Sequence, residues 1–369
     1  MGVLSLSIYH QEGILIKMIR LPVPIGRLIG QFDYYLRPFK PALIYYVLKN
    51  QIQSKQQINR LQTLDIAIGY ECNMKCEHCS AQIMSNKGKK KLSLPDYKNI
   101  NKELDRLGLF RINITGGEPL LYPWLEDLVK ILNPYRRHIK IQTNGSLLNE
   151  PRIVSLKKAG VNAISMSLDS LDEKEFERFR GLNGSFQKII SNIQLVRKYG
   201  LQISLGCVVT HQNLNSGEIE EIIKFSAQQK CHLLLNIAIA IGRWANREEF
   251  LFSREGQDRL RLNKLLKAYP HIHTDHDATG CPAGIRKLYL TPYGDVIPCP
   301  FLHVVFGNIK TESLSNIRRR ILINFPLFNS LNCPAGESME VYEKWLKEIW
   351  NMEEIPVHYS ALARLQPKP

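Results

Sequence analysis

Short β-type runs of apolar residues recur along the middle of the chain, and segments with helical spacing of apolar residues separate them. The strand-like runs are 64–70, 111–115, 138–143, 162–168, 202–209 and 232–241. Helical spacing is found at 94–107, 122–133, 149–159, 171–180, 185–199 and 217–230. Strands that alternate with helices predict βα units and a mainly parallel sheet. Six such units in about 180 residues favour a (βα)6 partial TIM barrel over a full eightfold barrel, which needs about 250 residues.

The pattern changes in the polar stretch 243–280, which indicates a domain boundary. Beyond it, 287–301 predicts a hairpin, because two β-rich runs flank a turn that contains Pro292 and Gly294. Helical spacing returns at about 312–324 and 338–350. We therefore expect an α/β chain divided into an N-terminal extension, a partial barrel, a linker, a small C-terminal α+β domain and a poorly structured tail, at 1–60, 61–245, 246–280, 281–350 and 351–369.

The composition is ordinary for a globular enzyme, with 369 residues of which 44% are hydrophobic and 22% charged. The N-terminus has no basic n-region, compact apolar run and small-residue cleavage site, so we expect no signal peptide. The eight cysteines are too sparse for a disulfide scaffold. They are expected to be reduced in the cytoplasm, where a clustered array indicates metal binding or catalysis.

The chain is basic, with 49 Lys and Arg against 34 Asp and Glu, a net charge of +15. Residues 1–60 combine eight basic side chains with only Glu12 and Asp33, and they are rich in large apolar residues. Such a segment can lie on an anionic membrane surface at the inner face of the membrane. The alternative is that it packs on the catalytic domain and exposes its charges to water. No nucleic-acid-binding motif accompanies the charge, so we expect no nucleic-acid partner.

Three cysteines follow the first predicted strand, in the stretch 71-ECNMKCEHCS-80. Structural zinc sites pair two knuckles of Cys or His, and no fourth ligand follows here at that spacing. Three thiolates around a [4Fe–4S] cluster leave one iron without a protein ligand, which a small molecule can then chelate.

The spacing C-x3-C-x2-C of Cys72, Cys76 and Cys79 resembles the cluster-binding loop of the radical S-adenosylmethionine (SAM) superfamily. The resemblance implies a [4Fe–4S] cluster whose open iron binds SAM. It implies reductive cleavage of SAM to a 5′-deoxyadenosyl radical, which abstracts hydrogen from a substrate. It also implies a reducing partner such as flavodoxin or ferredoxin.

Further motifs of this superfamily follow the next strands, in 115-TGGEP-119, 142-QTNG-145, 165-SMSLDS-170 and 178-RFRG-181. The resemblance assigns to SAM binding the residues Gly116, Gly117, Glu118, Asn144, Ser167, Asp169 and Arg180. In this scheme the glycines let the backbone approach SAM, and Glu118 accepts from its ammonium group. Ser167 and Asp169 bind the ribose, and Arg180 pairs with the SAM carboxylate.

A second cysteine set lies near the C-terminus, where Cys281 and Cys299 have the spacing C-x12-G-x4-C. This resembles the opening of SPASM and twitch domains, which carry auxiliary [4Fe–4S] clusters. The resemblance implies one auxiliary cluster with Cys281, Cys299 and Cys333 as ligands. Gly336 stands where a fourth thiolate is expected, which leaves that iron to substrate, water or Glu337. The alternative is three unrelated cysteines or a zinc site.

The resemblance therefore implies an enzyme that oxidises or couples carbon centres in a small-molecule, lipid-linked or peptide substrate. A ribosomal-peptide maturase is one alternative, and an iron–sulfur electron carrier without catalytic activity is another. An electron carrier has no need of Glu118, Asp169 and Arg180, so their presence favours the enzyme. The sequence does not identify a catalytic hydrogen donor, for which Tyr289, Tyr293 and Trp244 are the candidates.

Overall fold

The computed structural model describes Tyr45 and residues 61–84, 88–252, 256–275, 280–325, 333–352 and 355–361. Apart from Tyr45, the N-terminal segment that the sequence suggests for a membrane surface lies outside the described residues. Within those residues, no helix is both long enough and apolar enough to span a lipid bilayer.

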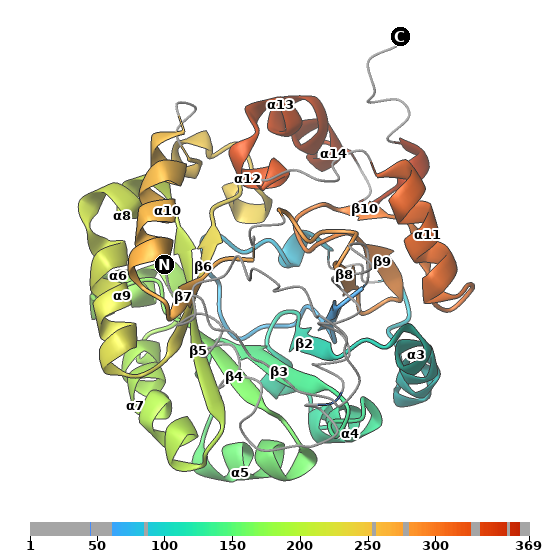
Figure 1. The fold of residues 1–369 in the computed structure, drawn as a ribbon, viewed down its shortest axis with the longest axis horizontal. Coiled ribbons are helices and arrows are strands. Elements are labelled where there is room, and N and C mark those ends of the chain that lie inside the picture. Colours follow the sequence, from blue (N-terminus) through green and yellow to red (C-terminus); the bar gives the residue numbers. More distant parts are fainter. Residues whose placement is uncertain are drawn as a thin grey trace, which may run out of the picture.

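One curved sheet forms the centre of the molecule (Figure 1). Its strand order is β11-β9-β8-β1-β2-β3-β4-β5-β6-β7, and all neighbouring pairs from β8 to β7 are parallel. The strands are β1 Thr63–Ala67, β2 Arg111–Thr115, β3 His138–Thr143, β4 Ala163–Ser167, β5 Gln202–Val209, β6 His232–Ile237, β7 Ile272–His273, β8 Lys287–Leu290, β9 Asp295–Ile297 and β11 Gly307–Asn308. β10 Val304–Val305 and β12 Val357–His358 form a separate parallel pair. The predicted α/β fold with a parallel partial barrel is confirmed.

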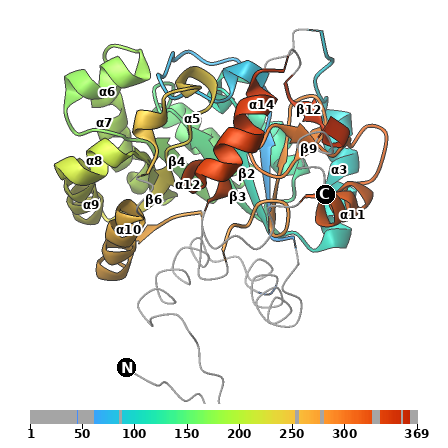
Figure 2. The ribbon, with the colours of Figure 1, turned by 90° about the horizontal axis from the view of Figure 1, so that it is seen from above.

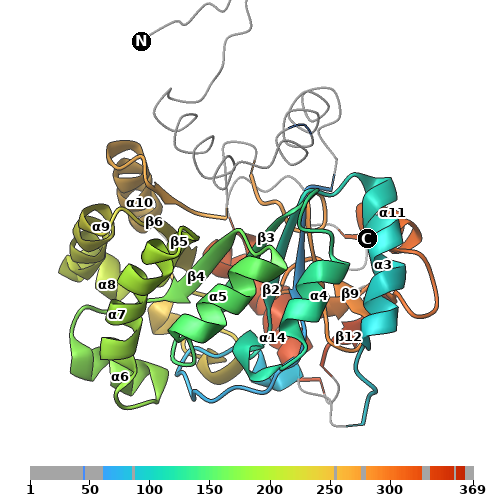
Figure 3. The same ribbon diagram turned by 90° about the horizontal axis from the view of Figure 1, so that it is seen from below.

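Helices surround this sheet on its outer side (Figure 1). Those of the barrel are α3 Leu94–Leu107, α4 Leu125–Ile131, α5 Glu150–Ala159, α6 Glu173–Arg180, α7 Ser185–Lys198, α8 His211–Ser216, α9 Glu218–Gln228 and α10 Gln257–Ala268. Those that follow β11 are α11 Leu314–Asn324, α12 Pro334–Glu337, α13 Met339–Val341 and α14 Lys347–Trp350. Figures 2 and 3 place α14 on the opposite side of the strands from α5.

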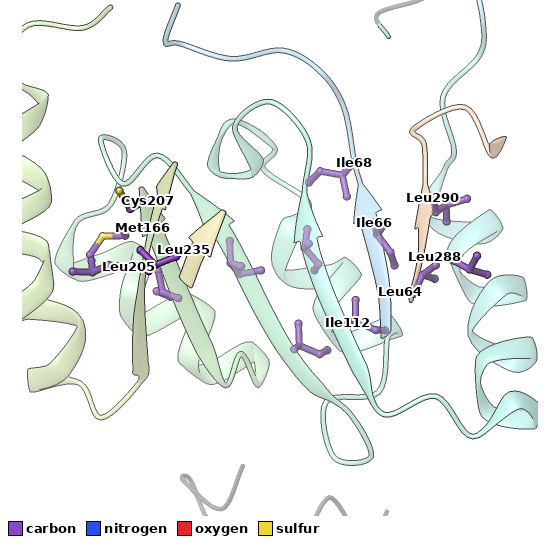
Figure 4. Close-up of a cluster of buried hydrophobic side chains, with 14 of the residues drawn as sticks. Leu64, Ile66, Ile68, Ile112, Met166, Leu205, Cys207, Leu235, Leu288 and Leu290 are labelled. Carbon is purple, nitrogen blue, oxygen red and sulfur yellow. The ribbon is translucent and has the colours of Figure 1, made fainter. Parts of the chain in front are cut away.

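Local sequence signals explain where the barrel helices begin and end. The Asn149 side chain accepts a hydrogen bond from the Arg152 amide at the start of α5. Asp172 caps α6 in the same way, and α6 ends at Gly181, whose φ of 66° suits glycine. Between the helices and the sheet lies a continuous aliphatic core, part of which Figure 4 shows along β1 and β8. This core fixes which face of each strand turns inward.

The predicted linker 246–280 contains regular structure in its described part. It forms α10 and then β7, where Ile272 pairs in parallel with Leu233 of β6. The predicted hairpin is formed by β8 and β9, with Tyr289 opposite Ile297. β8 also pairs in parallel with β1, so this hairpin extends the barrel sheet. Such pairing depends on residues far apart in the chain, which local patterns do not reveal.

Candidate active site

Cys72, Cys76 and Cys79 lie on the loop after β1 and line one cavity of about 300 Å³. This loop follows the carboxyl end of its strand, where βα barrels place their chemistry. The other predicted site residues that line the same cavity are Gly116, Gly117, Asn144, Ser167 and Arg180. The structure therefore brings together the predicted cluster ligands and most of the predicted SAM contacts.

Two distant segments hold the cysteine loop in place through its backbone. The Lys75 amide donates to the carbonyl of Arg180 at the end of α6, with an N–O distance of 3.2 Å. After β6, the Arg243 amide donates to the Cys79 carbonyl at 3.2 Å. Gly242 has a φ of 62°, and a Cβ at this position would lie 2.2 Å from the Cys79 oxygen. Only glycine therefore permits this approach.

Gly116 and Gly117 allow the loop after β2 to pack against the start of the cysteine loop. A Cβ on Gly116 would lie 2.2 Å from the Gly69 oxygen, and one on Gly117 would lie 2.2 Å from the Glu71 oxygen. The Gly117 amide donates to the Gly69 oxygen at 2.8 Å, and the Glu118 amide to the Glu71 oxygen at 2.8 Å. The two glycines thus serve backbone packing as well as access to the cavity.

The Glu118 carboxylate contacts protein donors in the structure, whereas the sequence predicts that it contacts SAM. Its side chain is fully buried and is not among the described residues that line the cavity. One carboxylate oxygen accepts from the Leu120 amide at 2.9 Å and the Thr143 hydroxyl at 2.7 Å. The other accepts from the Asn144 amide at 2.8 Å. Burial raises the pKa of Glu118, and these donors oppose that effect. Glu118 joins the loops after β2 and β3.

Asn144 connects the loop after β3 to the first cysteine. Its Nδ2 donates to the Asn73 Oδ1 at 2.9 Å and lies 3.8 Å from the Cys72 sulfur, within hydrogen-bond range for sulfur. Its Oδ1 accepts from the Ser146 amide at 2.9 Å. Burial raises the pKa of the Cys72 thiol, whereas the Asn144 contact lowers it. Asn144, which the sequence predicts to lie close to the site, thus contacts the cysteine loop through its side-chain amide.

Asp169 and Arg180, both predicted to contact SAM, form a buried ion pair with each other. Asp169 also accepts from the Val208 amide at 2.9 Å. Arg180 Nη1 lies 3.7 Å from the Cys76 sulfur, so its positive charge lowers the pKa of a thiol that burial raises. Among the described residues, the Arg180 Nε has no hydrogen-bond partner. Arg180 therefore presents charge to Cys76 and an unused donor near the cavity.

His78 supplies an aromatic wall to the cavity, a role that the sequence analysis does not assign. Its ring stacks on Phe179, with centroids 4.8 Å apart and planes 6° apart, and lies 5.7 Å from the Trp244 ring. Burial lowers the pKa of His78 to about 4, so the imidazole is neutral at pH 7. Its position inside the cysteine array is the sequence signal that could have indicated this role. Of the candidate hydrogen donors, Tyr289 and Trp244 also line the cavity.

The C-terminal cysteines also lie near one another. Cys281 precedes β8, Cys299 follows β9, and Cys333 caps α12. Burial raises the pKa of Cys299 to about 12, and electrostatic repulsion from Cys281 adds to this. Burial also raises the pKa of Cys333, and repulsion from Cys281 and Cys299 raises it further. Such mutual effects require the three sulfurs to be within electrostatic range of one another.

Glu337, the candidate side chain for the fourth iron of the auxiliary cluster, and Gly336, at the position of the missing thiolate, both make contacts within the protein. Glu337 forms a two-point ion pair with Arg259 and accepts from the Cys333 amide at 2.7 Å. Gly336 packs against the segment after β6, where an added Cβ would lie 2.9 Å from the Ala238 oxygen. A larger residue at 336 would displace this contact.

The donor sets fit iron–sulfur clusters, which Cys thiolates hold. In the part of the chain that the structure describes, no three Cys, His, Asp or Glu side chains converge as the ligands of a single metal ion do. The unused Arg180 donor beside Cys76 gives the first site a group for an anionic ligand.

The strands turn polar side chains into the cavity, where they lie beside apolar ones such as Met166, Leu234 and Ile237. Polar side chains from six strands line the cavity: Asp65, Thr115, Gln142, Ser165, Ser167, Asn236 and Lys287. Gln142, Ser165 and Asn236 carry hydrogen-bonding side chains on this lining. These groups are available to a hydrophilic ligand.

Two family models match the chain. The model of the radical SAM superfamily matches residues 66–226, and that of an iron–sulfur cluster-binding domain matches residues 281–330. The first match contains Cys72, Cys76 and Cys79, and the second contains Cys281 and Cys299. Cys333 lies just beyond the second match.

Curated relatives and solved structures agree with these matches. The PqqA peptide cyclase of Gluconobacter oxydans (strain 621H) is 24% identical over 265 residues, which cover 67% of this chain and 74% of the relative. The AdoMet-dependent heme synthase of Methanosarcina barkeri (strain Fusaro / DSM 804) is 24% identical over 291 residues, which cover 71% of this chain and 82% of the relative. The crystal structure of Streptococcus suis SuiB bound to precursor peptide SuiA has a TM-score of 0.58 at 18% identity, with 73% and 67% of the two chains covered. This structural likeness concerns the fold.

Proposed function

Because the chain is a radical SAM enzyme with a C-terminal iron–sulfur cluster-binding domain, we propose that it modifies a hydrophilic substrate, with a peptide as the preferred class. The observation that carries this proposal is the position of Cys72, Cys76 and Cys79 on one cavity that polar side chains from six strands also line. When bound, the cluster and SAM supply one-electron reduction and hydrogen-atom abstraction.

The residues around the cysteine loop prepare this site for its ligands. Cys72, Cys76 and Cys79 would hold the [4Fe–4S] cluster, and Arg180 stabilises the thiolate form of Cys76. Asn144 orients Cys72 through its side-chain amide. Ser167 lines the cavity and remains our candidate for a direct SAM contact.

Glu118 and Asp169 act through other residues in this proposal. Glu118 fixes the loops that carry Gly117 and Asn144, and Asp169 fixes the orientation of Arg180. Since both carboxylates are already engaged by protein donors, their substitution would displace the cavity wall rather than remove a single ligand contact.

Cys281, Cys299 and Cys333 would hold one auxiliary [4Fe–4S] cluster. Burial raises the pKa of all three thiols, and repulsion from the other cysteines raises the pKa of Cys299 and Cys333 further. Metal binding relieves both effects. The fourth position of this cluster is assigned to no side chain, because Glu337 is paired with Arg259.

A peptide is preferred to a lipid because of the inner surface of the barrel. Asp65, Gln142, Asn236 and Lys287 would contact whatever enters the cavity. Burying an acyl chain against them would remove water from these polar groups without replacing its hydrogen bonds, at a cost of about 1–3 kcal/mol for each group left unpaired. A peptide segment supplies amides and polar side chains that replace the lost water. Relatives whose names refer to peptides support the same class.

The test begins with iron content and SAM cleavage in full-length, anaerobically reconstituted protein with a flavodoxin or ferredoxin reductant. We expect about eight irons per chain, as two [4Fe–4S] clusters require, and release of 5′-deoxyadenosine. Cys76→Ala should abolish cleavage, whereas Cys299→Ala should retain it and lose product formation. Cys231→Ala is the matched control, because Cys231 is a buried thiol outside both sets.

The peptide class is tested separately, by co-expression with small peptides encoded next to this gene. A mass change in such a peptide that requires Cys76 would support the proposal. SAM cleavage in folded enzyme without any modified peptide, together with a modified aqueous metabolite, would assign a small-molecule substrate instead.

A further inference from the structure

Lys287 occupies an unusual position between the two cysteine sets. It is the first residue of β8, and its ammonium group lies 2.9 Å from an Asp65 oxygen and 2.9 Å from an Asp275 oxygen. The exposed fractions of the Lys287 and Asp65 side chains are 12% and 4%. Asn113 donates to the second Asp65 oxygen at 2.6 Å. All three charged residues line the cavity of the first cysteine set.

The backbone ties Lys287 equally closely to the second cysteine set. Its amide donates to the carbonyl of Pro282, the neighbour of Cys281, at 3.0 Å. The Gly284 amide donates both to the Lys287 carbonyl at 2.8 Å and to the carbonyl of Pro298 at 3.2 Å. Since Pro298 precedes Cys299, a single turn brings Lys287 next to the residues that carry both thiols.

The Lys287 charge is held in place and acts on these thiols. Burial alone would lower the pKa of Lys287, but Asp275 and Asp65 outweigh it and raise the pKa, so the side chain stays protonated. The charge in turn lowers the pKa of Cys281 and Cys299 against the effect of burial. Asp275 has the opposite influence on Cys281.

We propose that Lys287 is a positioning residue that makes the auxiliary cluster easier to reduce, an inference that rests on the proposed function of Cys281, Cys299 and Cys333. The reduction potential of an iron–sulfur cluster depends on the net charge around it and on its exposure to solvent. A fixed positive charge in a buried setting stabilises the form that holds one more electron. Asp65 and Asp275 limit this effect, because each carboxylate lies 2.9 Å from the Lys287 ammonium group.

The alternative is that the ion pairs only join strands. Lys287 connects β8 to β1 through Asp65, and to the segment after β7 through Asp275, so the pairs span the open side of the barrel. A purely structural role predicts that loss of either partner loosens the same region. An electrostatic role predicts opposite effects from removal of a positive and of a negative charge.

The experiment is a potentiometric titration of full-length, reconstituted protein, followed by electron paramagnetic resonance. The signal that does not change when SAM is added reports the auxiliary cluster. The variants are Lys287→Met, Lys287→Arg and Asp275→Asn, with Lys130→Met as control because Lys130 pairs with Asp127 on the exposed face of α4. Asp275→Asn leaves the Lys287–Asp65 pair intact, so it is informative even if Lys287→Met does not fold.

We expect the auxiliary potential to become more negative in Lys287→Met and more positive in Asp275→Asn. Lys287→Arg and Lys130→Met should stay near the wild-type value. Shifts of the same sign in the first two variants, or no shift in Asp275→Asn, would overturn the inference and leave the structural role. A wild-type protein without a second cluster signal would instead overturn the proposed auxiliary cluster, and the role of Lys287 with it.

Discussion

Glu118→Gln separates the role seen in the structure from the one that the sequence predicts. Glutamine keeps one acceptor oxygen, and its least costly orientation turns the NH2 group toward the Asn144 amide. That buried donor then loses its acceptor, at about 1–3 kcal/mol. The bonds from Leu120 and Thr143 remain but lose the help of a charged acceptor, about 1 kcal/mol each. Together these terms predict a loss of about 3–5 kcal/mol in the free energy of unfolding.

The assay is chemical denaturation of the full-length protein at neutral pH, without iron or SAM. A control is Glu340→Gln, because Glu340 is exposed and pairs with Lys344 on the same helical face. Such surface pairs contribute only about 0.3–0.5 kcal/mol. We expect Glu118→Gln to lower the denaturation midpoint strongly and Glu340→Gln to leave it almost unchanged.

The reasoning depends on the absence of SAM in this measurement. If Glu118 served only as an acceptor for the SAM ammonium group, its substitution would leave the stability of the ligand-free protein near wild type. Unchanged stability together with lost SAM cleavage would refute the joining role and restore the direct contact predicted from the sequence.

Two further predictions concern the cysteine loop. Gly242→Ala should lower the iron content of the first site and leave the auxiliary cluster in place, because the added Cβ would lie 2.2 Å from the Cys79 oxygen at a φ of 62°. Iron analysis and electron paramagnetic resonance measure this effect. A full iron content would contradict the prediction. Partial burial raises the pKa of Glu71, but hydrogen bonds from Lys91 and Tyr122 outweigh it and lower the pKa from 4.5 to about 2. Its stabilising effect is therefore complete above pH 4.5 and is lost as the pH falls through 2, so the difference in Tm between wild type and Glu71→Gln should shrink across that range.

The barrel elements could be predicted from the sequence because their signals are local. All six predicted barrel strands are found, and α3 has the predicted bounds Leu94–Leu107. The sequence does not predict β7, because a strand of two residues is defined by its pairing with β6 rather than by its own pattern. The helix α10 was missed in a polar stretch, where its weak amphipathic character resembles that of a loop.

The candidate site could be predicted in its residues but not in its contacts. The resemblance to the radical SAM superfamily implies that Cys72 and Arg180 belong to one site. It does not indicate that Arg180 pairs with Asp169, nor that Glu118 faces backbone amides. Such choices depend on which donors remain unpaired after the loops have packed, and this is a property of the tertiary structure.

The parallel pairing of β8 with β1 has a consequence for how the protein is made. β1 emerges early from the ribosome, yet one of its edges stays unpaired until Lys287–Leu290 have been synthesised. The nascent barrel therefore carries an open strand edge through most of translation, the kind of surface on which other chains can add. A fragment cut between the two cysteine sets would keep that edge permanently.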